Sequence, residues 1–148
     1  MENLNDLYQW LIEQGVLIFE RQLPFTQDNC HALTIHLNVQ NTWGIFVDKD
    51  RLITAAAEKS AVLHESGHYA TGATHSISSP IDLVEKHEYS ADKWAIQRAF
   101  SAEELDLAVA EGYTTLWDLA DYFGVTEDFM RKAVCWYTHG NLAADLYF

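Results

Sequence analysis

Five consecutive residues, His64-Glu65-Ser66-Gly67-His68, constrain this chain more than any other part of its sequence. They form an H-E-x-x-H pattern in which the two histidines are four residues apart. On an α-helix, residues at that spacing project from one face, so both imidazoles could reach a single metal ion. Glu65 follows about 100° further around the helix and could address a water molecule beside that ion. The pattern therefore predicts a helix that carries a zinc site and a general base.

A second segment places acidic side chains where a buried helix face is expected. In a helix predicted from Pro80 to about Ala99, the residues on that face are Val84, Glu88, Ala91, Asp92, Ala95 and Ala99. A buried carboxylate is costly unless a metal, a cation or hydrogen-bond donors compensate it. We expect Glu88 to be a third metal ligand and Asp92 to accept a hydrogen bond from the outer nitrogen of a ligand histidine. The alternative is a solvated acidic face with ordinary ion pairs to lysine.

Two histidines and one glutamate leave one tetrahedral position of a zinc ion open, which is typical of catalytic sites. His64, His68 and Glu88 would bind one Zn²⁺, although manganese or iron could replace it. Glu65 would take a proton from the attacking water and pass it to the leaving amine. His75, in the loop after the motif, could stabilise an oxyanion, or it could be an ordinary solvent-exposed histidine.

The remaining periodicity predicts a single α+β domain over residues 1–148. Asn3 is expected to cap a first helix that ends at Gly15. Three strands are predicted at Val16–Glu20, Ala32–Leu37 and Trp43–Val47, with a hairpin loop between the last two and the sheet expected to be antiparallel. The motif helix should run from about Thr54 to Tyr69. Shorter helices should follow, one from a Ser101–Glu104 capping box to Gly112 and two more at Thr115–Phe123 and Thr126–Thr138. We expect residues 1–100 to hold the sheet and the metal-site helices, and residues 101–148 to form a helical part.

Composition excludes several classes of protein. The chain has 148 residues and a formal net charge of −13, with nine Lys and Arg against 22 Asp and Glu, so a free-standing nucleic-acid binder is not expected. Cys30 and Cys135 are too few for a disulfide framework or a cysteine zinc site. The N-terminal residues lack a signal-peptide pattern, and no apolar stretch is long enough to span a bilayer. We therefore expect a cytoplasmic protein without membrane association.

Two stretches of the sequence resemble the ImmA/IrrE family of zinc metallopeptidases. The first is Ala57-Glu58-Lys59-Ser60-Ala61-Val62-Leu63-His64-Glu65-Ser66-Gly67-His68, and the second is Glu88-Tyr89-Ser90-Ala91-Asp92-Lys93-Trp94-Ala95. The second stretch is similar to the family's E-x-x-A-[DN]-x-[aromatic]-A signature. Nineteen residues separate His68 from Glu88, a spacing similar to that of thermolysin-like zincins. The resemblance departs from the family at Ser66, where an aliphatic residue is usual.

The resemblance implies a zincin-like fold and a particular activity. It implies that His64, His68 and Glu88 are zinc ligands, that Glu65 is the catalytic base and that Asp92 orients a ligand histidine. The chain looks like the short, ImmA-like form, whose relatives cleave helix-turn-helix repressors of prophages or mobile elements. The expected partner is thus a basic helix-turn-helix repressor, attracted by the acidic charge. The resemblance also suggests that an edge strand, at Trp43–Val47, could pair with an extended substrate segment. The alternative is an edge strand that binds nothing.

Two other functions fit parts of the same sequence. A non-catalytic antirepressor would bind and sequester its target, with zinc only holding the fold together. A DNA-binding regulator would use Thr115–Val134, which resembles a helix-turn-helix in outline. The exposed charges expected there are acidic and would repel phosphate, namely Asp118, Asp121, Glu127 and Asp128. The sequence favours the peptidase and predicts no particular oligomeric state.

Overall fold

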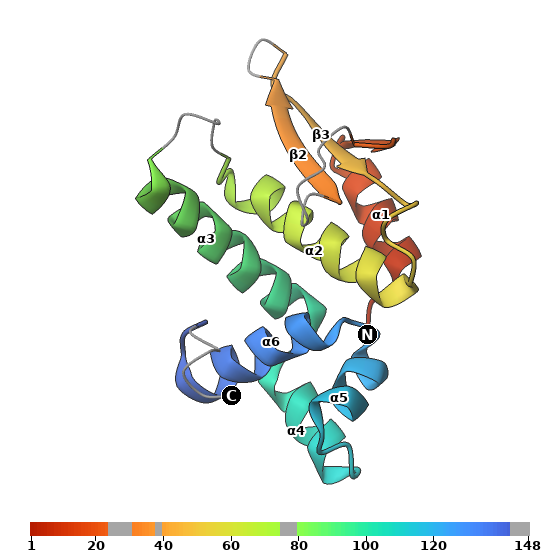
Figure 1. Ribbon diagram of the computed structural model, residues 1–148, viewed down its shortest axis with the longest axis vertical. Helices are drawn as coiled ribbons and strands as arrows, with labels where there is room; N and C mark the ends of the chain where they lie inside the picture. The colour runs from red at the N-terminus through yellow and green to blue at the C-terminus, as the bar shows by residue number, and fades with distance from the viewer. Residues whose placement is uncertain (24–30, 38–39, 75–79, 143–148) are drawn as a thin grey trace.

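The computed structural model describes residues 1–23, 31–37, 40–74 and 80–142, in which six helices accompany one three-stranded sheet (Figure 1). The α+β class expected from the sequence is therefore confirmed. In chain order the elements are α1 (Leu4–Glu13), β1 (Leu17–Glu20), β2 (Ala32–Leu37), β3 (Thr42–Val47), α2 (Ala55–Thr71), α3 (Ile81–Ala99), α4 (Ala102–Ala110), α5 (Leu116–Phe123) and α6 (Glu127–His139). None of the helices in the described ranges is long and apolar enough to cross a membrane.

The sheet is mixed, with strand order β1-β3-β2, so the expectation of a purely antiparallel sheet is wrong. The short connection between β2 and β3 requires them to pair antiparallel, with Thr34 opposite Ile45. Residues 21–31 connect β1 to β2, and this longer connection allows β1 to lie away from β2. Strand β1 pairs in parallel with β3, with Ile18 opposite Ile45. The expectation that Trp43–Val47 is an edge strand is also wrong, because β3 lies in the centre. The strand beside α2 that forms an edge is β2 (Figure 1).

Helix α2 is the centre of the domain, since it packs against α1, α3, β2 and β3. Its Val62 and Leu63 are completely buried and join the main apolar cluster. That cluster takes side chains from every layer, including Leu7, Leu11, Ile45, Val47, Ile96, Phe100, Phe123 and Met130. Burial of this apolar surface is the main force that holds α2 in place, and α2 carries the H-E-x-x-H residues.

The helix ends follow local sequence signals. Asn3 and Ser101 cap α1 and α4 as expected, and Ser101 forms the expected capping box with Glu104. Asn3 also forms a complete box, with Asp6, which was not expected. Thr54 caps α2 by accepting a hydrogen bond from the Ala57 N–H. Gly72 ends that helix in the left-handed region at φ 66°. The last helical residue is Thr71, two positions after the expected Tyr69.

The C-terminal helices are attached to α2 through polar contacts to its first turns. The Lys59 ammonium donates a 2.8 Å hydrogen bond to the carbonyl of Phe123, the last residue of α5. The Thr126 N–H, at the start of α6, donates to Ser60 Oγ at 3.0 Å. These contacts bring the N-terminal end of α6 close to α2, and α6 then crosses α3 (Figure 1).

Candidate metal centre

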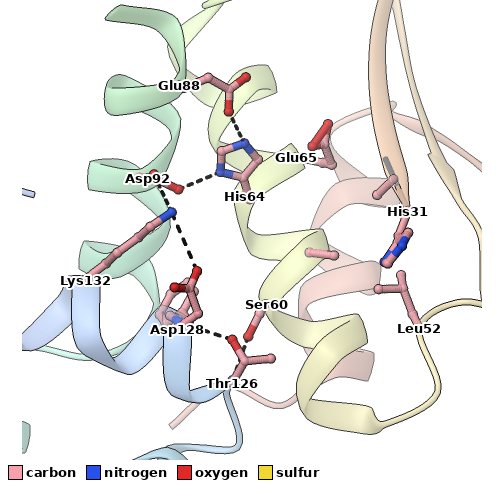
Figure 2. Close-up of a pocket in the computed structure, with 13 residues that line it drawn as sticks. His31, Leu52, Ser60, His64, Glu65, Glu88, Asp92, Thr126, Asp128 and Lys132 are labelled. Atoms are coloured by element: carbon pink, nitrogen blue, oxygen red, sulfur yellow. Dashed lines mark hydrogen bonds and ion pairs between the residues drawn. The ribbon is translucent and has the colours of Figure 1, made fainter. Parts of the chain in front are cut away.

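Two neighbouring helices supply the side chains of the site. Helix α2 carries His64, Glu65 and His68, and α3 carries Glu88 and Asp92. The helices approach closely because Gly67 has no side chain at the point where it faces the Ala91 backbone. Ala91 and Ala95 on α3 are fully buried. Figure 2 shows the result for three of these side chains, because Glu88 and Asp92 on α3 both point toward the His64 ring on α2.

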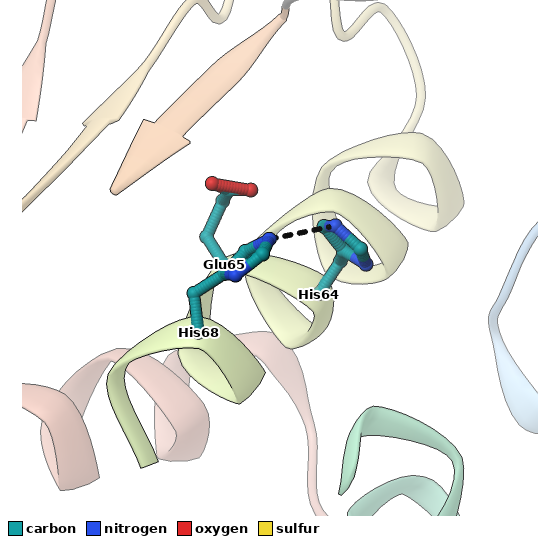
Figure 3. A group of neighbouring side chains, drawn as sticks. All are labelled: His64, Glu65 and His68. Atoms are coloured by element: carbon teal, nitrogen blue, oxygen red, sulfur yellow. Dashed lines mark hydrogen bonds between the residues drawn. The ribbon is translucent and has the colours of Figure 1, made fainter. Parts of the chain in front are cut away.

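Three of these side chains meet through their nitrogen and oxygen donor atoms. His64 Nε2 lies 2.7 Å from Glu88 Oε2, and His68 Nε2 lies 3.2 Å from Glu88 Oε1. The two Nε2 atoms are 3.2 Å apart (Figure 3). Ligand atoms about 2.05 Å from a tetrahedral zinc ion would be about 3.3 Å from one another. The donor set and its spacing therefore fit one zinc ion, with only small movements of the Glu88 carboxylate.

The outer nitrogen of each histidine also has an acceptor, and this fixes the tautomer. His64 Nδ1 lies 2.7 Å from Asp92 Oδ1, the contact that the sequence pattern predicted for Asp92. His68 Nδ1 donates to the Ala73 carbonyl at 2.6 Å. Because a carbonyl oxygen can only accept, His68 Nδ1 must carry the proton, and the Nε2 lone pair can point at a metal. Asp92 favours the same tautomer in His64.

The charges around the histidines attract positive charge. Burial alone would lower the pKa of His64, but hydrogen bonds to Asp92 and Glu88 outweigh burial and raise it to about 10. The pKa of His68 is raised for the same reason, against the effect of burial, by Glu88 and the Ala73 carbonyl. Conversely, both imidazoles hold the pKa of Glu88 well below its usual range, although burial opposes this. A cation at this point would replace protons as the partner of Glu88.

Glu65 is close to the histidines but makes different contacts. Its side chain and those of His64 and His68 each offer a ligand atom, and these atoms lie within 4.8 Å of one another. The residue is 7% exposed, and its carboxylate points toward β2 (Figure 3). There Thr34 Oγ1 lies 3.0 Å from Glu65 Oε1. This placement suits a group that handles a proton beside a metal rather than one that binds the metal.

An open cleft of about 570 Å³ extends from this point toward the start of α6 (Figure 2). Its walls come from the start of β2, the middle of α2, the middle of α3 and the first turns of α6. The residues that line it are His31, Ala32, Leu52, Ser60, Ala61, His64, Glu65, Glu88, Asp92, Thr126, Asp128, Phe129 and Lys132. The cleft is large enough to hold several residues of an extended chain.

Sequence reasoning missed two residues that contact the site. Lys132 Nζ, from α6, lies 3.2 Å from Asp92 Oδ2, so Asp92 connects a lysine to the His64 imidazole. Thr34 contacts Glu65 from a strand 31 positions earlier. Neither belongs to a motif, and only the expected alternation of Ala32–Leu37 could have placed Thr34 on the inner face of the sheet. His75, the suggested oxyanion stabiliser, lies outside the described residues.

We compared the chain with known proteins in three ways. No family model, no curated protein and no solved structure matches it.

Proposed function

We propose that this protein is a zinc-dependent endopeptidase. The observation that carries the proposal is the meeting of His64, His68 and Glu88 within 2.7–3.2 Å, with acceptors on both outer nitrogens. An ordinary ion pair with Glu88 would not need two histidines whose Nε2 atoms face the same point. This arrangement, on an H-E-x-x-H helix followed by a helix with a third carboxylate ligand, supports a zincin-like site.

The roles of the residues follow from their positions. His64, His68 and Glu88 would hold zinc, which when bound supplies a Lewis acid that polarises the peptide carbonyl and acidifies the attacking water. Glu65 accepts the proton of that water as the carbon–oxygen bond forms. It then gives the proton to the leaving nitrogen as the carbon–nitrogen bond breaks. Asp92 keeps His64 in the orientation and tautomer that face the cleft.

The cleft supports cleavage within a chain rather than at its end. It is open, and one side begins at β2, which has β3 on one edge and no other described strand on its other edge. An extended substrate segment could add to β2 through main-chain hydrogen bonds and pass over Glu65. This proposal gives β2 the role that the family resemblance suggested for Trp43–Val47. The net charge of −13 favours a basic substrate, such as a helix-turn-helix repressor of a phage or mobile element.

Metal analysis and one substitution test the proposal. The purified protein should contain one equivalent of zinc and should cut a candidate repressor at a single position, which intact-mass measurement would detect. Glu65→Gln should keep the zinc and lose the cut, whereas His64→Ala should lose both. If Glu65→Gln inactivates the repressor as well as the unchanged protein does, the protein is a non-catalytic antirepressor that acts by sequestering its target.

A further inference from the structure

The Thr34 hydroxyl lies between two acceptors of a single residue. Its Oγ1 is 3.0 Å from the Glu65 carboxylate oxygen Oε1 and 3.0 Å from the Glu65 backbone carbonyl oxygen. Thr34 belongs to β2 and Glu65 to α2, so only the packing of the sheet on the helix creates this contact. The pairing of Thr34 with fully buried Ile45 places both side chains on the sheet face that covers α2.

A buried carboxylate with few donors is a costly arrangement. Glu65 is only 7% exposed, and an uncompensated charge there would destabilise the fold. A hydroxyl can compensate both forms because it donates one hydrogen and also accepts. Lysine or a backbone N–H could only donate, and would therefore oppose the protonated form of Glu65.

We propose that Thr34 is a positioning residue that holds Glu65 in place before and after it takes up a proton. This inference rests on the endopeptidase activity proposed above. With Glu65 ionised, the Thr34 hydroxyl donates to Oε1. With Glu65 protonated, the carboxyl O–H can donate to Thr34 Oγ1, and the Thr34 hydroxyl turns to the Glu65 carbonyl. Both acceptors are 3.0 Å away, so only hydrogen atoms need to move.

The proton count of the reaction is unchanged by this role. The proton that Glu65 accepts comes from the water that attacks the substrate carbonyl. It leaves on the amine nitrogen when the peptide bond breaks. Thr34 keeps its own hydrogen throughout and forms no bond to the substrate. Its contribution is to keep the Glu65 side chain in one orientation between the two proton transfers.

Three variants test the role of Thr34. Thr34→Val removes the hydroxyl but keeps the shape and the strand preference of threonine, and Thr34→Ser keeps the hydroxyl. Thr42→Val is the matched control, because Thr42 is a strand residue in β3 whose hydroxyl donates to the Gln40 carbonyl. Each variant is loaded with zinc, its zinc affinity is measured by competition with a chelator, and its crystal structure is determined. The kinetic probe is a fluorogenic version of the peptide that the unchanged protein cleaves best in a proteome-derived peptide library.

We expect Thr34→Val to bind zinc as the unchanged protein does, but to show the Glu65 side chain in several orientations. Loss of a hydrogen bond to a charged group should lower kcat about 10-fold to 100-fold with KM nearly unchanged. Thr34→Ser should restore a single Glu65 orientation and most of kcat. Thr42→Val should match the unchanged protein in all measurements.

The outcomes separate this inference from the proposed function. If Glu65→Gln is inactive but Thr34→Val matches Thr42→Val in kcat and keeps a single Glu65 orientation, the role of Thr34 is wrong and the peptidase remains. If Glu65→Gln cleaves the peptide at the normal rate, or if no library peptide is cleaved, the proposed activity fails. The crystal structures still decide whether Thr34 orients Glu65, because an ordered Glu65 in Thr34→Val contradicts that role.

Discussion

Gly67 on α2 faces the backbone of Ala91 on α3 so closely that a methyl group on Gly67 would come within 2.8 Å of the Ala91 Cα. Interhelical contact at this distance is possible only without a side chain on one helix. The metal-site residues His64 and His68 lie on either side of this glycine, and Glu88 lies one turn from Ala91. The distance between the two helices at Gly67 therefore sets the distance between the three proposed metal ligands.

Gly67→Ala should separate the helices and weaken the site. Overpacking of this kind lowers the free energy of unfolding by about 1–3 kcal/mol, and the displaced α3 should carry Glu88 away from the histidines. Urea unfolding and chelator competition would measure the two effects. Ala70→Gly, at an exposed position of α2, is the control. It should cost about 1 kcal/mol through helix propensity but leave the zinc affinity unchanged. An unaltered zinc affinity in Gly67→Ala would contradict this account of the interface.

Zinc should stabilise the fold, because it would join two helices that otherwise meet only through packing and ion pairs. At a free zinc concentration about 100 times the dissociation constant, the free energy of unfolding should rise by about 2.7 kcal/mol. Urea unfolding in zinc-buffered and chelator-treated samples would measure the difference. Glu88→Ala should remove most of this stabilisation. A protein whose unfolding curve does not respond to zinc has no such site.

Asp92→Asn should weaken zinc binding about 10-fold to 100-fold, as is typical when the partner of a ligand histidine is changed. The amide cannot replace the charge that Asp92 presents to His64 Nδ1 at 2.7 Å. Asp128→Asn is the matched control. Asp128 also lies near Lys132, with 3.9 Å between Oδ2 and Nζ, but it is largely exposed and does not touch a histidine. Equal zinc affinities for the two variants would remove Asp92 from the site.

Lys59 should make stability depend on pH in the alkaline range. Burial lowers the pKa of Lys59 below its ordinary value of 10.5, and the charge of Glu2 opposes this only in part. Between the lowered folded pKa and about 10.5 the unfolded chain binds more protons than the folded one, so stability rises with pH in that window. Relative to Lys59→Met, the unchanged protein should therefore gain stability as the pH rises toward about 10.5.

The comparison with Lys59→Met cancels the contributions that all other titratable groups make to the two stability curves. Lys86→Met, at an exposed position of α3, controls for the loss of one positive charge. If the stability of the unchanged protein and that of Lys59→Met change with pH in parallel, Lys59 has the same pKa in the folded and the unfolded state, which contradicts the prediction.

Salt should slow the attack on a basic substrate. Because the chain carries a net charge of −13, attraction of a basic repressor should raise kcat/KM at low ionic strength. We expect kcat/KM to fall several-fold as the ionic strength rises from about 0.01 M to about 0.15 M, over which the screening length shortens from about 30 Å to about 8 Å. A neutral peptide substrate serves as the control and should be affected much less. Equal salt dependence for the two substrates would contradict a charge-attracted basic partner.

Local chemistry explains which features could be predicted from the sequence. The cap at Asn3 and the capping box of Ser101 with Glu104 depend on residues within one helical turn, so the sequence alone predicted both. The return contact from Asp6 that completes a box at Asn3 was not predicted. The spacing within His64–His68 and within Glu88–Asp92 depends only on helix geometry. Whether these side chains meet depends further on how closely the two helices approach, and the structure has that contact between Gly67 and Ala91.

Other features depend on contacts between residues far apart in the chain, and only the tertiary structure determined them. The position of β1 beside β3, the edge position of β2 and the contact of Thr34 with Glu65 depend on which surfaces pack together. The same holds for Lys132, which reaches Asp92 only because α6 crosses α3. Periodicity determines which face of an element is apolar, because it reflects the geometry of a single helix or strand. It carries no information about which other element covers that face, and that choice places the partners of Glu65 and Asp92.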